Sequence, residues 1–193
     1  ILSINYQIGQ YLPDWHPWEK IKDFYVSKKK TGACREIVPF ELTWIMDIFG
    51  LPKVLNSYKS KLSNLQMKAD DFYSFNLKFP KNIIANITVE VLSRVTPTRS
   101  MIILGSKGKI FFNNEDKIIK LYKTPQSIKN FKFDEGKPHK GYVYSEKPYV
   151  DEMRDFINAA RNKKNSLFPH DLKKDANILK VLEEIEKNCK QIV

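Results

Sequence analysis

The residues best suited to bind a ligand are concentrated in one short stretch, from Tyr11 to Trp18. This segment, Tyr-Leu-Pro-Asp-Trp-His-Pro-Trp, contains an acid, a histidine and three large aromatic side chains. Its two prolines interrupt any helical or strand period and predict an ordered loop. Flat apolar rings pack on the C–H faces of a sugar, and polar tips bind its hydroxyls. We therefore expect a sugar-like ligand here, lined by Tyr11, Asp14, Trp15, His16 and Trp18, whereas burial in the core is the simpler alternative for any single ring.

A second candidate site is the segment Arg35–Glu41, at the start of a predicted helix. Its two acids, Glu36 and Glu41, are a possible carboxylate pair for acid–base chemistry, although a spacing of five places them poorly on a shared helix face. The alternative is that acids near a helix N-terminus simply complement the helix dipole. We include Arg35 among the expected substrate-binding residues.

Several other kinds of site have no counterpart in the sequence. There is no CxxC, no HExxH and no glycine-rich phosphate loop, and His16, His139 and His170 are too far apart to suggest a local zinc site, so no metal is expected. Two cysteines fit a reducing compartment rather than a disulfide scaffold. No apolar run approaches the about 18 residues of a membrane span. The expectation is a cytoplasmic protein with no membrane partner.

The net charge of +11 raises the question of an anionic partner. Only five of the 33 basic residues are arginine, the type that suits bidentate contacts to phosphates and bases, and the lysines are scattered. The charge is therefore interpreted as a lysine-rich surface, and nucleic acid is disfavoured as a partner. A non-enzymatic binding module for an anionic partner or nucleic acid remains the alternative function.

The elements that must position these residues follow from hydrophobic periodicity. We expect a strand over residues 1–8, the loop, a short helix over 18–25, and a helix over 35–49 with Pro39 near its first turn and Gly50 as its stop. From residue 54 to about 133 the period changes to two, which predicts consecutive strands at 73–79, 85–91, 100–104, 109–112 and 117–122. Apolar stripes then predict two helices, over 150–160 and 172–192.

This order of elements predicts an α+β fold, an open and mostly antiparallel sheet with helices packed on one face. The other face must be polar or covered by another chain or domain. The sequence opens without Met and directly in a strand. We therefore expect residues 1–193 to be one domain, a fragment of a longer protein.

Four segments in this order resemble the C-terminal domain of the Gfo/Idh/MocA oxidoreductases. They are Gly9–Glu19, Glu41–Gly50, Ile102–Ile110 and Tyr149–Ile157. The resemblance implies a sheet like those in the C-terminal domains of dihydrodipicolinate reductase and glyceraldehyde-3-phosphate dehydrogenase. It also implies a two-domain, NAD(P)-dependent enzyme acting on a sugar, polyol or sugar-nucleotide derivative. The cofactor would lie on the protein's own N-terminal Rossmann domain, and none would bind to this fragment. Substrate binding and a homodimer or larger homo-oligomer through the sheet face are implied as well.

The chain departs from the family pattern at one important position. Many members carry an Asp and, four residues later, a His that takes part in proton transfer; the matching residues here are Glu36 and Phe40. Because Phe cannot transfer a proton, the expected catalytic candidates are His16, Glu36 and Glu41, unless the parent protein binds its ligand without turnover. Arg94 or Arg99, at predicted strand ends, is expected to meet an anionic part of the substrate, and both are counted among the expected substrate-binding residues.

Overall fold

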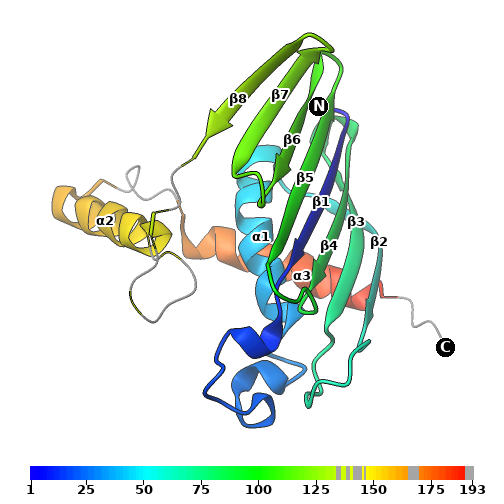
Figure 1. Cartoon of the computed structure of the whole chain (residues 1–193), viewed down its shortest axis with the longest axis vertical. Helices are drawn as coiled ribbons and strands as arrows, with labels where there is room; N and C mark the ends of the chain where they lie inside the picture. The colour runs from blue at the N-terminus through cyan, green and yellow to red at the C-terminus, as the bar shows by residue number, and fades with distance from the viewer. Residues whose placement is uncertain (134–135, 138–139, 141–144, 146, 165–169, 190–193) are drawn as a thin grey trace.

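The structure is a computed structural model that describes residues 1–133, 136–137, 140, 145, 147–164 and 170–189. Its centre is one open sheet of eight strands in the order β2-β3-β4-β1-β5-β6-β7-β8 (Figure 1). The strands are β1 (Ser3–Gly9), β2 (Lys53–Ser60), β3 (Phe72–Phe79), β4 (Ile83–Glu90), β5 (Thr98–Gly105), β6 (Gly108–Asn113), β7 (Ile118–Thr124) and β8 (Ser127–Lys132). The helices are α1 (Cys34–Phe49), α2 (Lys147–Asn162) and α3 (Leu172–Lys187). The predicted α+β class is confirmed.

The strands pair antiparallel with one exception, the parallel pair of β1 and β4. Tyr6 on β1 lies opposite Ile87 of β4 on one side and Met101 of β5 on the other. The predicted hairpin of β3 and β4 is present and pairs in register from Phe72↔Glu90 to Phe79↔Ile83. The first strand of the chain is therefore inserted into the middle of the sheet.

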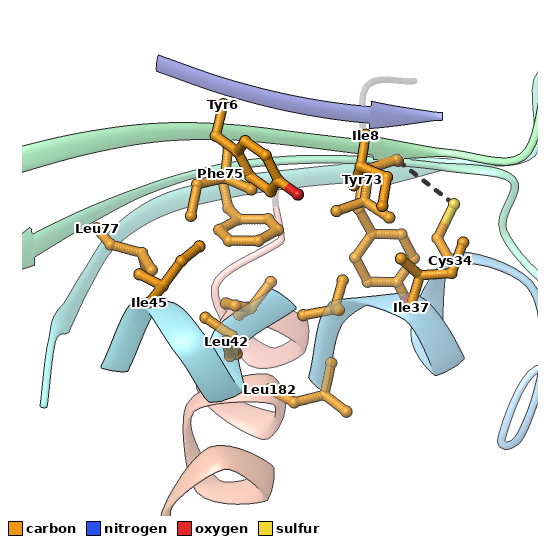
Figure 2. Close-up of a cluster of buried hydrophobic side chains, with 14 of the residues drawn as sticks. Tyr6, Ile8, Cys34, Ile37, Leu42, Ile45, Tyr73, Phe75, Leu77 and Leu182 are labelled. Atoms are coloured by element: carbon orange, nitrogen blue, oxygen red, sulfur yellow. Dashed lines mark hydrogen bonds between the residues drawn. The ribbon is translucent and has the colours of Figure 1, made fainter. Parts of the chain in front are cut away.

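Helices α1 and α3 pack against one face of the sheet and enclose the core (Figure 2). Alternate residues of the central strands point towards them, because side chains on a strand alternate between its two faces. The α1 side chains Leu42 and Ile45 and the α3 side chain Leu182 are fully buried against this face. Helix α1 ends as predicted at Gly50, whose φ of 87° suits a glycine. Pro39 lies inside the helix rather than near its first turn.

Three elements differ from the prediction. The stretch from Trp18 to Tyr25 is not an α-helix: it holds the short 3-10 turns Ile21–Asp23 and Tyr25–Ser27, and Phe24 between them is extended at φ −98° and ψ 150°. A further 3-10 turn, Leu12–Asp14, lies in the predicted loop. Strands β2 and β8 were not predicted as separate strands: β2 buries only Ser57 fully, and β8 has only exposed residues, so neither has a regularly alternating buried face.

Helix α2 forms where the apolar stripe predicts it but packs differently from α3. None of its described residues is buried, and Val150, Met153 and Ile157 are 48%, 57% and 40% exposed. Helix α3 instead buries Ile178 and Ile185 in the core. In Figure 1, α2 stands apart from the layer that α1 and α3 form. Among the described residues, no helix is long and apolar enough to cross a membrane.

The sheet face opposite α1 and α3 carries a row of polar side chains across β2, β3, β4 and β1, and the row ends at Ile102 of β5, which pairs with Asn5. Asn56, Asn76, Asn86 and Asn5 form a row across β2, β3, β4 and β1, each in register with the next. The side-chain amide of Asn76 donates to the Asn56 oxygen over 2.7 Å, and that of Asn86 donates to Asn5 over 2.8 Å. This row is polar, whereas coverage of the face by another chain or domain stays a prediction; we call the row the asparagine row.

Candidate functional site

The predicted site residues gather around the end of the sheet where β1 ends. The 3-10 turns, the β2–β3 and β4–β5 connections and the N-terminus of α1 all lie at this end (Figure 1). Tyr11, just after β1, forms an isolated bridge with Leu92, just after β4. The thiol of Cys34 at the start of α1 donates to the Val89 carbonyl of β4 over 3.4 Å. These contacts fix the loop and the helix start to the same strand end.

The loop folds its histidine into an aromatic cluster. The His16 ring lies 5.2 Å from the Trp18 ring and 4.4 Å from the Phe24 ring, centroid to centroid. Its Nδ1 is 3.2 Å from a Glu19 carboxylate oxygen. Trp18 is 72% exposed, so it is not a core residue. Trp15 instead packs against the core, and its buried indole N–H has no hydrogen-bond partner among the described residues.

Tyr25 connects this cluster to helix α1. Its ring lies 4.6 Å from Phe24, and its hydroxyl donates to Oε1 of Glu36 over 2.6 Å. Desolvation by the surrounding protein, followed by the hydrogen bond to Glu36, raises the pKa of Tyr25 to about 12. The other Glu36 oxygen, Oε2, is buried and has no hydrogen-bond partner within the described ranges. The structure thus joins His16 and Glu36 through two rings that sequence reasoning missed.

Glu41 belongs to a separate, buried cluster. Its carboxylate accepts hydrogen bonds from the Tyr6 hydroxyl at 2.5 Å, the Trp44 indole at 2.9 Å and the Arg99 guanidinium at 2.5 Å. The Glu41 side chain is 5% exposed and that of Arg99 is 44% exposed. Burial, and then the adjacent Glu41 carboxylate, raise the pKa of the Tyr6 phenol. The carboxylates of Glu36 and Glu41 therefore have different partners.

The three predicted arginines differ in what they contact. Arg35 donates hydrogen bonds from Nε to a Glu186 carboxylate oxygen over 2.9 Å and from Nη1 to the Lys30 carbonyl over 2.8 Å. Arg99 is engaged by Glu41. Arg94 stacks its guanidinium on the Tyr11 ring, 4.3 Å from the centroid, and forms no ion pair with a described carboxylate.

Tyr11 and Arg94 also line a cavity of about 470 Å³ at this end of the sheet. Its remaining walls come from the β2–β3 connection and the start of the β4–β5 connection: Leu62, Ser63, Asn64, Leu65 and Leu92. No sequence signal marked the β2–β3 residues, because only the fold brings them beside Tyr11. We call this space the Tyr11–Arg94 cavity.

Two further positions complete the predicted set. Asp14 is exposed in the 3-10 turn that follows Tyr11. Phe40, at the position where the resemblance expects a histidine, is 68% exposed one helical turn after Glu36. An exposed phenyl ring beside Glu36 makes this part of α1 a partly apolar surface.

Comparison with known proteins finds matches among solved structures. No family model and no curated protein matches the chain. Levoglucosan dehydrogenase, in complex with NADH and levoglucosan, is 15% identical with a TM-score of 0.69, and the match covers 97% of this chain and 56% of the dehydrogenase. UDP-N-acetylglucosamine 3-dehydrogenase from Acidithiobacillus ferrooxidans is 10% identical with a TM-score of 0.65, covering 97% and 53%.

A third match is an oxidoreductase from Agrobacterium radiobacter in complex with NAD+, L-tartaric acid and magnesium. It is 10% identical with a TM-score of 0.71, covering 96% of this chain and 52% of that one. The chain thus spans about half the length of these proteins. Its fold is that of the C-terminal domain of Gfo/Idh/MocA-type oxidoreductases, as the sequence resemblance predicts.

The described residues do not fit a nicotinamide dinucleotide. A dinucleotide site of the Rossmann type needs consecutive parallel strands and a glycine-rich turn leading into a helix N-terminus. Here the parallel pair is β1 and β4, with α1, β2 and β3 between them in the chain. Within the described ranges there is also no group of three His, Cys, Asp or Glu side chains placed to hold a metal ion.

Proposed function

We propose that this chain is the substrate-binding and oligomerisation domain of an NAD(P)-dependent oxidoreductase acting on a sugar, polyol or sugar-nucleotide derivative. The observation that carries the proposal is the match of nearly the whole chain to about half of each dehydrogenase. The described residues form no dinucleotide site of the Rossmann type, so in this proposal the cofactor belongs on another domain. The N-terminal Rossmann domain implied by the sequence resemblance is the proposed partner.

In this proposal the sugar lies against the exposed ring of Trp18, near His16 and Glu36. Phe40 cannot exchange a proton, so the proposed proton-handling groups are the Glu36 carboxylate, with the Tyr25 phenol hydrogen-bonded to it, and His16. The unpartnered Oε2 of Glu36 supports this role, because a buried acceptor without a partner gains from a hydroxyl donor. The full set of contacts around Glu41 favours a positioning role for that residue.

The proposal is tested on the purified chain and on the complete gene product. The chain is screened by saturation-transfer NMR against sugars, polyols and sugar nucleotides, and the complete product is assayed for NAD(P) reduction with the same compounds. We expect carbohydrate binding to the chain that weakens at least tenfold in His16→Ala and Trp18→Ala. Tyr58→Ala is the control for Trp18→Ala, because it also removes a large ring but lies on β2, outside the loop.

Two results would contradict the proposal. One is a complete product that reduces neither cofactor with any of these compounds. The other is binding of nucleic acid by the chain with a steep dependence on salt, which would favour the non-enzymatic binding module.

The proposed oligomer forms through the sheet face that α1 and α3 leave uncovered. Two copies of a chain with a net charge of +11 repel each other, and the asparagine row offers a neutral surface whose amides both donate and accept hydrogen bonds. Sedimentation velocity is expected to show a dimer or larger species for the native chain and a monomer for Asn86→Lys. Asn158→Lys on α2 is the control for the added charge, and a native chain that stays monomeric at all concentrations would refute this interface.

A further inference from the structure

We infer that the Tyr11–Arg94 cavity binds an anionic group, a phosphate or a carboxylate, on the sugar-like ligand. The substrate class is then an acidic or phosphorylated sugar derivative rather than a neutral sugar. This inference rests on the proposed function and narrows it. It adds a second recognition point at the end of the sheet that also carries the cluster of His16 and Glu36.

The first argument is that Arg94 has no acidic partner. Arg35 and Arg99 have carboxylates at 2.9 Å and 2.5 Å, so their charges are already compensated inside the protein. Arg94 forms no ion pair with any carboxylate that the structure describes. A guanidinium presents five N–H donors in a planar fork that matches a phosphate or carboxylate.

The second argument is that Arg94 is held in position before any ligand binds. Its guanidinium stacks on the Tyr11 ring at 4.3 Å. The Tyr11 backbone is in turn fixed by its bridge to Leu92 and by the hydrogen bond from the Leu12 amide to the Val91 carbonyl at 3.2 Å. A stacked guanidinium still exposes its N–H edge, and holding it in place lowers the entropy cost of binding.

The third argument concerns the cavity wall formed by the β2–β3 connection. The buried acid Asp71 holds this wall in place but does not line the cavity. Asp71 is fully buried and accepts hydrogen bonds from the amides of Leu62 and Ser63, at 2.6 Å and 2.9 Å, and from the Ser63 hydroxyl at 2.6 Å. Lys61 lies 3.8 Å from the same carboxylate. The charge of Asp71 is thus compensated within the loop that forms the wall.

The cavity lining itself suits an anion attached to a sugar. The residues that line it include a guanidinium and the Asn64 amide as donors and no carboxylate, and the Ser63 hydroxyl already donates to Asp71. Its volume of about 470 Å³ exceeds what a phosphate alone needs and falls in the range of small-molecule sites. Leu62, Leu65 and Leu92 supply the apolar contacts that a sugar ring requires.

The test is calorimetric titration of the purified chain with three probes: glucose, glucose 6-phosphate and glucuronate. We expect one or both anionic probes to bind at least tenfold more tightly than glucose, with the stronger of the two identifying the group as phosphate or carboxylate. Arg94→Gln is expected to remove at least tenfold of that affinity, and Arg94→Lys to recover part of it, because lysine keeps the charge but not the fork. Arg161→Gln on α2 is the matched control and should bind like the native chain.

Equal affinity for glucose and both anionic probes would overturn the inference, as would an Arg94→Gln variant that binds like Arg161→Gln. Circular dichroism spectra and melting curves of each variant confirm that folding is unchanged. The inference and the proposed function fail separately. A complete gene product that oxidises only neutral sugars overturns the inference alone, whereas Arg94-dependent binding by a product without oxidoreductase activity overturns the function alone.

Discussion

Substitution Glu41→Gln tests whether this buried acid stabilises the fold. The native carboxylate accepts from Tyr6, Trp44 and Arg99. Glutamine has one acceptor oxygen and brings an NH₂ group, so at least one of these donors loses its acceptor, which costs about 1–3 kcal/mol when the group is buried. The ion pair with Arg99 adds up to about 1 kcal/mol, the scale of exposed pairs, because that arginine is 44% exposed. The expected loss in free energy of unfolding is therefore about 1–4 kcal/mol.

The assay is urea unfolding of the native chain and the variant, followed by tryptophan fluorescence and circular dichroism. Fluorescence reports directly on the cluster because Trp44 is one of the three donors. Glu183→Gln on α3 is the control: this acid is 61% exposed, and its nearest cation, Lys187, is 3.9 Å away. We expect the control to change stability by less than about 0.5 kcal/mol.

A double-mutant cycle with Arg99→Gln isolates the ion pair from the two neutral hydrogen bonds. The reasoning is refuted if Glu41→Gln is as stable as the control or more stable than the native chain. In that case the carboxylate would not be committed to the fold and would be free for chemistry on a ligand. A destabilised variant that still binds its ligand once folded would establish the positioning role.

Three further predictions concern other contacts of the strand end. Glu36→Gln should lower the pKa of Tyr25 from about 12 towards its ordinary value, seen by NMR of tyrosine labelled at Cζ. Because the pKa of Tyr25 is raised in the folded state, the stability it gives is lost as the pH rises from about 10 to about 12. The native chain should therefore lose more free energy of unfolding over this pH range than Glu36→Gln. Equal losses in the two proteins would contradict this prediction. Gly9→Ala should lower the free energy of unfolding by about 1–3 kcal/mol in urea, because its Cβ would lie 1.6 Å from a Glu90 oxygen; unchanged stability would show that Glu90 moves freely. Asp71→Asn should speed hydrogen exchange in residues 61–65, and native exchange rates there would argue against its role in ordering that wall.

Periodicity in the sequence was enough to predict the elements with a clear buried face. The hairpin of β3 and β4 and helix α1 were predicted because their apolar residues repeat with periods of two and of about 3.6. All residues of strand β8 are exposed, and α2 has an apolar stripe of which no described residue is buried. The sequence pattern shows which face of an element is apolar, but it does not show what covers that face. The parallel pairing of β1 with β4 could not be predicted either, because these two strands are far apart in the sequence.

In the candidate site, too, residues close together in the sequence could be predicted, whereas residues brought in by tertiary contacts could not. The loop from Tyr11 to Trp18 was recognisable because its unusual residues are consecutive. Tyr25 and Ser63 were not, because they reach the site through tertiary contacts with no sequence signal. Charge alone also treated Arg94 and Arg99 alike, and only the fold shows that one is paired with Glu41 and the other is not.

The central position of β1 has a consequence for the order in which the protein folds. Strands β2–β4 and β5–β8 are two meanders of chain neighbours, and β1 is the strand that joins them. Asn5 meets its partner Asn86 across a separation of 81 residues, so docking β1 requires closure of a long loop, whereas each meander forms from local contacts. We expect the meanders to form first and β1 to dock late. Because Tyr11 follows directly from β1, ligand binding would then appear only in the last kinetic phase of refolding, as the two halves of the sheet are joined.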